Sequence, residues 1–381
     1  MPELIQTRNL QWVAPPHSGR FWRHALLAAL VGIAGMHAPP VHSQARAGYT
    51  ATDYARLDNP GATPVIRGLN SANEVAGGFQ RDRRRASSAL VFSANNVAEE
   101  VPADQGAGSS VAYGLNDQGE VVGAFNTNVS LRPFRAVRRQ ALQELALPPG
   151  SNGGIAFALN ELGEAAGYAS GSGGIRAVWW TQRGDVQVLQ NIGNQTARAL
   201  DLNDRGDIAG VSGDAVKTAV LWPRKGGIVS LGTLPGYTHS EAVSVSDNGT
   251  LAGVATGPGQ SIDRFRAVLW RPGTLAIQDL GTLPGGTDSR ARDVNNRGEV
   301  VGTSNSSRGD RAFVWTAATG MRDLNELVSV PGLVMTDALG INRRGDIVVM
   351  GHDAQTHAHG EADDHVDHHT ARRIFVLRAL Q

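Results

Sequence analysis

Apolar and polar positions alternate in short runs along nearly the whole chain after residue 47. The runs are rich in Val, Ala, Leu and Trp, and clusters of Asn, Asp, Gly and Arg separate them. Outside the N-terminus, no long stretch carries apolar residues at the spacing of an amphipathic helix. This pattern predicts an all-β protein built from short strands and tight turns.

One nine-residue pattern recurs seven times, and its regular copies read LNDQGEVVG from Leu115 and VNNRGEVVG from Val294. Neighbouring copies lie 43 to 49 residues apart. The anchor residues at the second position are Asn70, Asn116, Asn160, Asn203, Ser246, Asn295 and Asn342. A period of roughly 40–50 residues is typical of repeat proteins, in which each unit buries its apolar face against its neighbours.

Each repeat predicts four strands, and the sixth copy is the clearest example. Its strands are expected at 291–294, 299–303, 311–315 and 321–324. Asn295 to Gly298 forms the turn between the first two, because Asn bonds its own backbone and Gly adopts the left-handed conformation that ends a bulged hairpin. In the first copy Asn73 replaces this glycine, and Asn is the next-best residue for a positive φ.

Four strands in each of seven repeats predict a seven-bladed β-propeller. The segment 54–57 resembles a fourth strand, whereas the last repeat ends after its third strand, at 373–377. We therefore expect the N-terminal strand to complete the last blade and to remove two exposed sheet edges. The alternative is an open β-solenoid, which needs no complementary ends.

Two further residue types recur at fixed places. A glycine seven residues after the anchor indicates a bulge or the close approach of another backbone. It occurs at Gly77, Gly123, Gly167, Gly210, Gly253 and Gly302, and only Val349 breaks the series. An aromatic residue on the third strand is either a stacking surface for sugars or inter-blade core, and we favour the core. It occurs as Phe92, Trp180, Trp222, Trp270 and Trp315.

Composition narrows the classes of partner. The 381 residues include 35 basic and 35 acidic ones, so the net charge is zero and no global field directs the chain to nucleic acid. The absence of cysteine excludes disulfides, thiolate metal sites and cysteine nucleophiles. We expect a monomer that binds a protein, a glycan or a surface polymer.

Residues 1–47 resemble an export signal. Arg20 and Arg23 precede the apolar run 25–34, and Ala45 and Ala47 are small residues suited to cleavage after position 47. The run is too short for a permanent transmembrane helix, and a buried helix of the mature domain is the alternative. We expect a secreted, extracellular or periplasmic protein, with the propeller spanning residues 48–381.

The insertion at 352–370 is the main candidate for metal chemistry, because it holds six of the chain's 11 histidines. Imidazoles two and four residues apart beside carboxylates suit Zn²⁺, Ni²⁺ or Cu²⁺. The alternative is a solvated loop without a metal role, and no cofactor is required. The candidate ligands are His352, Asp353, His357, His359, His365, His368 and His369.

Two segments, Leu231–Ser240 and Leu280–Ser289, read LGTLPGYTHS and LGTLPGGTDS, and each is followed by the turn motif and an Arg-Ala-x-x-Trp-type strand. They resemble the HAF family of probable extracellular repeat proteins of bacteria. The resemblance covers roughly residues 54–381, with Arg-Ala-Phe or Arg-Ala-Val in place of the family's His-Ala-Phe. It implies export and a repeat fold, and it supplies no catalytic residues.

No catalytic constellation is evident, because the chain has no nucleophile elbow, phosphate loop or His-Glu-x-x-His motif. An acid recurs after the turn in nearly every repeat, which favours a structural role. The sequence therefore favours an exported, non-enzymatic binding module. The alternatives are a propeller hydrolase or lyase with an unidentified site, and a metal-binding protein that uses the His-rich insertion.

Overall fold

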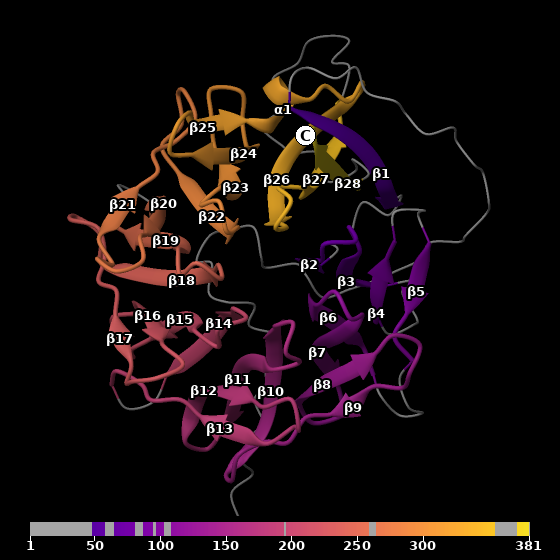
Figure 1. Ribbon diagram of the computed structural model, residues 1–381, viewed down its shortest axis with the longest axis vertical. Coiled ribbons are helices and arrows are strands. Elements are labelled where there is room, and N and C mark those ends of the chain that lie inside the picture. The colour runs from indigo at the N-terminus through magenta and orange to yellow at the C-terminus, as the bar shows by residue number, and fades with distance from the viewer. Residues whose placement is uncertain are drawn as a thin grey trace, which may run out of the picture.

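The computed structural model describes residues 48–57, 65–80, 87–93, 97–102, 108–193, 196–258, 264–354 and 372–380. Seven four-stranded antiparallel sheets stand around a central axis like the blades of a propeller (Figure 1). The predicted seven-bladed β-propeller is therefore confirmed. The four-residue helix α1 (Leu324–Leu327) interrupts the strands, and no helix in the described ranges is long and apolar enough to cross a bilayer.

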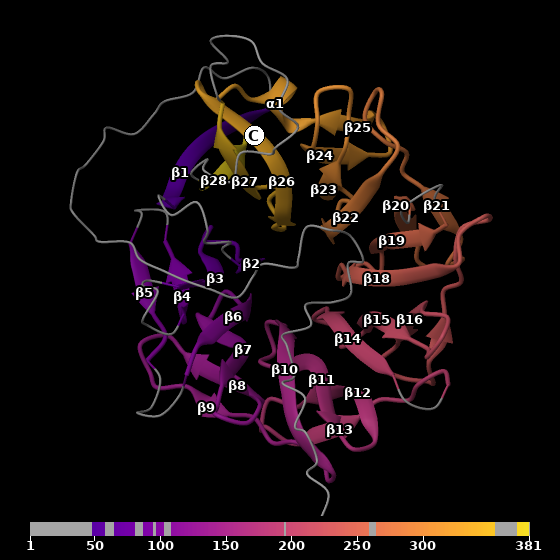
Figure 2. The ribbon, with the colours of Figure 1, turned by 180° about the vertical axis from the view of Figure 1, so that it is seen from behind.

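Each blade runs from an inner strand at the axis to an outer strand at the rim (Figures 1 and 2). The first two blades contain β2 (Val65–Leu69), β3 (Val75–Gln80), β4 (Ser87–Phe92) and β5 (Ala98–Glu100), then β6 (Ser110–Leu115), β7 (Glu120–Asn126), β8 (Leu131–Val137) and β9 (Gln143–Glu144). The third and fourth contain β10 (Ser151–Leu159), β11 (Ala165–Gly171), β12 (Gly174–Trp180) and β13 (Val186–Val188), then β14 (Ala197–Leu202), β15 (Ile208–Ser212), β16 (Thr218–Trp222) and β17 (Val229–Ser230).

The remaining blades follow the same order along the chain. The fifth and sixth contain β18 (His239–Val245), β19 (Leu251–Gly257), β20 (Arg264–Trp270) and β21 (Ile277–Asp279), then β22 (Ser289–Val294), β23 (Val300–Ser304), β24 (Arg311–Thr316) and β25 (Gly320–Asp323). The seventh contains β26 (Leu333–Ile341), β27 (Ile347–Asp353), β28 (Arg372–Ala379) and β1 (Tyr49–Leu57).

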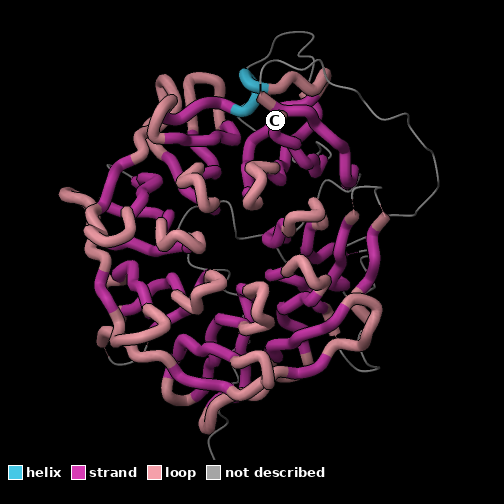
Figure 3. The backbone as a smooth tube through the Cα atoms, in the orientation of Figure 1, coloured by secondary structure: helices cyan, strands magenta, loops and turns pink. Residues whose placement is uncertain are grey.

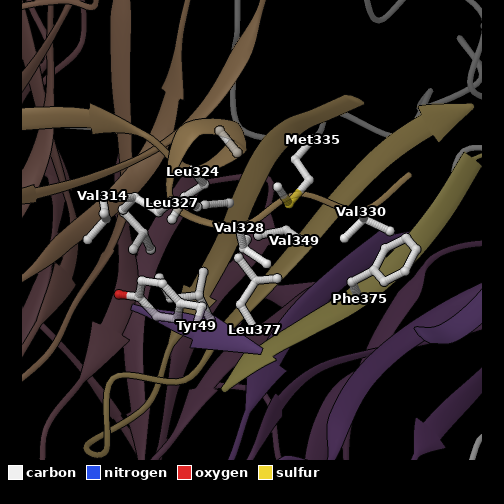
Figure 4. Packing of buried hydrophobic residues seen from close by; sticks show 14 of the residues in the cluster. Tyr49, Val314, Leu324, Leu327, Val328, Val330, Met335, Val349, Phe375 and Leu377 are labelled. Atoms are coloured by element: carbon white, nitrogen blue, oxygen red, sulfur yellow. The ribbon is translucent and has the colours of Figure 1, made fainter. Parts of the chain in front are cut away.

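The N-terminal strand closes the ring, as predicted. β1 pairs with β28 in antiparallel register from Tyr49 opposite Ala379 to Leu57 opposite Arg372. It begins five residues earlier than the sequence suggested, because Tyr49 packs with Phe375 and Leu377 in the core of the seventh blade (Figure 4). This pairing shields the edge of the last sheet and ties the two ends of the described chain together.

The recurrent glycine allows two backbones to meet. In the fifth blade, an added Cβ at Gly253 would lie 2.0 Å from the carbonyl oxygen of Glu241. The inner strand bulges beside this point, since its register shifts between Ala242 and Ser244. In the seventh blade Val349 breaks the series, and a second register shift in β26 moves the close approach to Gly351.

The recurrent aromatic residues are buried between blades, which supports inter-blade core over sugar stacking. Trp180 and Trp270 have no exposed surface, and Trp222 is 5% exposed. The indole N–H groups of Trp180, Trp222 and Trp270 donate to the carbonyl oxygens of Ala146, Gln190 and Leu231 at 2.7, 2.7 and 2.9 Å. Each of these indoles therefore bonds to the chain segment that precedes its own blade.

Candidate functional site

Seven turns, one from each blade, surround the axis on one face of the propeller, which we call the turn face (Figure 3). Their glycines have φ between +72° and +87°, and Asn73 has φ +62°. These values match the left-handed conformation predicted for the last position of the turn. The left-handed turn position read from the sequence is therefore confirmed in all seven blades.

The anchor asparagines join neighbouring blades. Asn160 Oδ1 accepts the N–H groups of Leu162 and Glu164 at 3.1 and 2.9 Å, while its Nδ2 donates to the carbonyl of Asn203 in the next blade at 3.1 Å. Five other anchors repeat the inter-blade bond, and Asn342 closes the circle onto Asn70. The pairs are Asn70–Asn116, Asn116–Asn160, Asn203–Ser246, Asn295–Asn342 and Asn342–Asn70.

The recurrent acids belong to the same framework. Asn160 Nδ2 also donates to Glu164 at 3.0 Å, four residues later, and the other anchor asparagines treat their own acids alike. These acids are Glu74, Glu120, Asp207, Glu299 and Asp346. A carboxylate used in this way fixes the turn, which supports the structural role favoured by the sequence.

A cavity of about 150 Å³ lies inside this circle and opens on the turn face. The residue after each anchor lines its mouth. These residues are Ser71, Asp117, Glu161, Asp204, Asp247, Asn296 and Arg343, which we call the mouth residues. Four of the seven are acidic, so the mouth carries a local negative charge although the chain as a whole is neutral.

Arg343 spans the mouth. It extends from the seventh blade to form ion pairs with Asp204 of the fourth blade and with Asp247 of the fifth, the latter at 3.4 Å. Burial opposes the charge of Arg343, but the two carboxylates outweigh it and raise the pKa of this guanidinium. The acidic mouth thus already holds one cationic group, which belongs to the protein itself.

Asp117 and Glu161 lie beside this pair without a cation of their own. Neither forms an ion pair with any residue that the structure describes, although each accepts a backbone N–H from the preceding blade. Burial raises the pKa of Glu161, and the neighbouring carboxylates of Asp117 and Asp204 raise it further. This part of the mouth is therefore suited to an incoming positive charge.

Two carboxyl groups and a hydroxyl form the floor of the cavity. Ser244 Oγ donates to Asp293 Oδ1 at 2.7 Å, and Asp201 Oδ2 accepts the N–H of Val245 at 2.7 Å. Burial raises the pKa of Asp201 to about 7, and the nearby charge of Asp293 adds to this shift. Burial also raises the pKa of Asp293. At neutral pH the floor therefore holds a partly protonated carboxyl pair.

The floor breaks the sevenfold repetition. Its residues stand two positions before the anchor, where the fourth, fifth and sixth blades have Asp201, Ser244 and Asp293. The other four blades have Gly68, Gly114, Ala158 and Gly340. Sequence reasoning did not single out these carboxyls or the mouth residues. The signal was the appearance of aspartate at an aligned position that otherwise carries small residues.

Only part of the predicted metal site lies within the described residues. His352 and Asp353 end β27, and the Asp353 carboxylate contacts Arg373 at 3.5 Å. The other five candidates, His357, His359, His365, His368 and His369, lie outside the described residues. Among the described ranges, no group of three or more His, Cys, Asp or Glu residues is arranged to hold a metal. The metal site remains a prediction.

Comparisons with known proteins identify the fold and go no further. No family model and no curated protein matches the chain. An oligogalacturonate lyase in complex with manganese is similar at TM-score 0.53 and 12% identity, covering 90% of this chain and 97% of that one. A prolyl endopeptidase structure is similar at TM-score 0.53 and 9% identity, over 84% of this chain and 55% of that one. TolB from Acinetobacter baumannii scores 0.45 at 13% identity, over 71% and 60% of the two chains.

Proposed function

We propose that this protein is an exported, non-enzymatic β-propeller that binds a partner protein on its turn face. In this proposal, a basic side chain of the partner enters the acidic mouth of the axial cavity. The observation that carries the proposal is Arg343, whose guanidinium already lies between Asp204 and Asp247. A surface that holds its own guanidinium has the charge and spacing needed to hold another.

The neighbouring carboxylates supply the second position. Asp117 and Glu161 face the same opening, and the raised pKa of Glu161 reflects burial and a negative charge that nothing nearby offsets fully. An arriving ammonium or guanidinium would relieve this repulsion and donate charge-assisted hydrogen bonds to the carboxylates. Such binding depends on local charge, so it fits a chain with no net charge.

Agmatine, a small molecule with a guanidinium and an ammonium group, tests this site by titration calorimetry at low salt. The double variant Asp117→Asn, Glu161→Gln should bind agmatine at least about 10-fold more weakly, since an ion-pairing position worth about 1.4 kcal/mol is lost. Arg343→Ala should bind it more tightly than the wild type, because the internal competitor is gone. Added salt should weaken binding in every variant.

Glu326→Gln provides the control, because Glu326 is an exposed carboxylate on α1 and is not a mouth residue. Its affinity for agmatine should equal that of the wild type. If neither the wild type nor Arg343→Ala binds agmatine, the proposal is wrong. If Glu326→Gln and the double variant lose the same affinity, agmatine responds to the overall charge of the protein and not to the mouth residues.

The floor of the cavity favours one second candidate, a hydrolase or lyase. Two carboxyls of raised pKa, one of them near 7, are suited to general acid and general base roles at neutral pH. Asp201 and Asp293 occur in single blades, and catalysis requires such asymmetry. Turnover of a glycan or ester that disappears in Asp293→Asn, while agmatine binding persists, would favour this enzyme over the binding module.

Export and family membership belong to the same proposal. The basic and apolar N-terminal segment, with small residues at 45 and 47, supports a secreted, extracellular or periplasmic location. The repeated LGTLPG segments support membership of the HAF family. A third role, metal binding through the His-rich insertion, rests on composition alone, and zinc calorimetry on a chain lacking 352–369 tests it separately.

A further inference from the structure

Each inner strand bulges three residues before its anchor, and the bulged residues form a second layer around the axis. The register shift at this position leaves one residue of each strand without a partner in the ladder, and β10 and β26 each have one further shift nearer their start. The bulged residues are Arg67, Tyr113, Phe157, Leu200, Val243, Arg292 and Leu339. Like the cavity floor, this layer differs from blade to blade.

Two arginines of the layer meet inside the ring. Arg67 and Arg292 hold the same bulged position on the inner strands β2 and β22, and besides burial the charge of Arg292 lowers the pKa of Arg67, so each guanidinium lies within the other's electrostatic field. Arg67 lies on β2 and Arg292 on β22, and the seventh blade separates these strands (Figure 2). Side chains from the first and sixth blades can approach each other only across the space that the inner strands enclose. Both arginines therefore face the axis.

Within the described part of the chain, neither arginine has an acidic partner. Arg67 forms no hydrogen bond or ion pair with any described residue, and the Nε atom of Arg292 is buried without a partner. Burial lowers the pKa of Arg67 to about 10, and among nearby groups only Tyr113 acts in the opposite direction. Solvent reaches Arg67 although protein surrounds it, which fits a side chain inside the ring. Two like charges without a counter-ion destabilise the fold unless an anion joins them.

Aromatic rings flank the two charges. The rings of Tyr113 and Phe157 meet edge to face with centroids 5.3 Å apart, and Phe157 lies 5.7 Å from Tyr168. Tyr113 holds the same bulged position on β6, the inner strand next to β2, and the charge of Arg67 acts on its hydroxyl group. The layer thus combines two planar cationic groups with a cluster of aromatic rings.

We propose that this layer binds an organic carboxylate with a planar or apolar body. The forked guanidinium groups of Arg67 and Arg292 would take the carboxylate, since their geometry matches its two oxygens. The body of the ligand would lie against Tyr113 and Phe157. The carboxylate comes either from a free small acid or from the C-terminus of a peptide. This site is independent of the acidic mouth and of its proposed basic partner.

Calorimetry at pH 7.5 with three probes separates these sources. The probes are benzoate, the peptide acetyl-Gly-Gly-Phe with a free C-terminus, and the same peptide amidated. Binding of benzoate identifies a free acid, and binding of only the free-terminus peptide identifies a peptide end. Either result supports the site. Binding of the amidated peptide equal to that of the free one contradicts it, as does binding of no probe.

Variants assign the binding to this layer. Arg67→Met and Arg292→Met should each weaken binding of the carboxylate probe at least about 10-fold. The affinity of Arg67→Lys should lie between those of the wild type and Arg67→Met, because lysine keeps the charge but lacks the forked guanidinium. The exposed Arg322→Met is the matched control and should bind as the wild type does. Asp117→Asn should also leave this affinity unchanged, which distinguishes the site from the mouth.

Thermal unfolding gives an independent readout. Without ligand, Arg67→Met should raise the Tm by about 2 °C, because the repulsion between two unpaired guanidinium groups disappears. A structural arginine would instead lower the Tm when removed. A lower Tm in Arg67→Met together with unchanged probe binding would overturn the proposal.

Discussion

Two sets of residues on the same seven inner strands behave in opposite ways. The anchor positions are nearly identical in every blade, and their amide groups bond both their own turn and, in six cases, the next blade. The wall of the axial space lies two and three positions earlier, and there the side chains differ from blade to blade. It holds a coupled carboxyl pair and two arginines that have no acidic partner among the described residues.

The contrast separates blade assembly from ligand chemistry. A residue needed to join each blade to the next must recur in each blade, whereas a binding site on the axis needs different groups on different sides. Electrostatic repulsion within the wall adds no stability. We infer that the repeated positions specify the ring and that the unrepeated ones specify what the ring binds.

The fifth blade shows that the circle accepts a substitute. Ser246 cannot reach the next blade as asparagine does, and its hydroxyl bonds Thr250 O at 3.1 Å instead. Asn248, two residues later, donates to Asn296 O at 2.7 Å and restores a link between the fifth and sixth blades. The inter-blade link is thus kept although the residue that makes it has changed.

Breaking the circle should have the largest effect. Asn160→Ala leaves the N–H groups of Leu162 and Glu164 and the carbonyl of Asn203 without their partner. We expect the free energy of unfolding to fall by about 3 kcal/mol, the cost of several unmade buried hydrogen bonds. Urea denaturation measures this loss.

Two variants calibrate that result. Asn160→Ser keeps a hydroxyl, as Ser246 does, and its free energy of unfolding should fall by only about 1 kcal/mol. Asn128 is exposed and forms no hydrogen bond with any described residue, so Asn128→Ala should change stability by less than about 0.5 kcal/mol. A loss in Asn160→Ala no greater than in Asn128→Ala would show that the circle does not hold the blades together.

Removing a charged group from the wall should instead raise the free energy of unfolding. The pKa of Asp201 is about 7 in the folded chain, against 3.8 as its ordinary value. Between about pH 4 and pH 7 the folded form therefore keeps a proton that the unfolded form has lost, and wild-type stability falls as pH rises through this window. Asp201→Asn cannot ionise. It should match the wild type near pH 4 and exceed it by about 2 kcal/mol at pH 8, allowing for solvent in the cavity.

The difference between wild type and variant isolates the carboxyl pair of Asp201 and Asp293, because the titrations of groups outside this pair cancel. Asp293→Asn should lower the pKa of Asp201, since the charge of Asp293 contributes to its raised value. The loss of stability with rising pH should then end at a lower pH. The expectation fails if Asp201→Asn is less stable than the wild type at pH 8. It also fails if the stability difference does not change with pH.

The sequence allowed the ring to be predicted because the ring is repetitive. Seven copies of one turn identified the blades, and the positive φ required by Gly298 or Asn73 is a local property that one residue type reveals. The start of β1 was missed because Tyr49 depends on packing against Phe375 and Leu377, more than 300 positions away in the chain.

The candidate sites were harder to predict for the same reason. Arg343 and Asp204 lie in different blades, and only closure of the ring brings them together across the mouth. Arg67 and Arg292 likewise meet only inside the ring. Aligning the repeats would have revealed Asp201 and Asp293 as departures from small residues, but their coupling depends on three-dimensional burial.

The smallest effect is expected from a comparison of two adjacent tryptophans in the third blade. Trp180 occupies the repeated aromatic position, and its indole N–H donates to Ala146 O at 2.7 Å. Trp179 has no counterpart in that series, and its Nε1 is buried without a partner while Arg224 lies 4.8 Å from the ring centroid. Trp180→Phe should cost about 1 kcal/mol or slightly more, through the lost hydrogen bond and the smaller ring. Trp179→Phe loses no hydrogen bond, so its unfolding midpoint in urea should move less. If Trp179→Phe lowers the unfolding midpoint more than Trp180→Phe does, recurrence of a residue along the chain does not indicate how much it contributes to stability. The distinction between repeated positions that hold the ring and unrepeated positions that bind a ligand would then be unsupported.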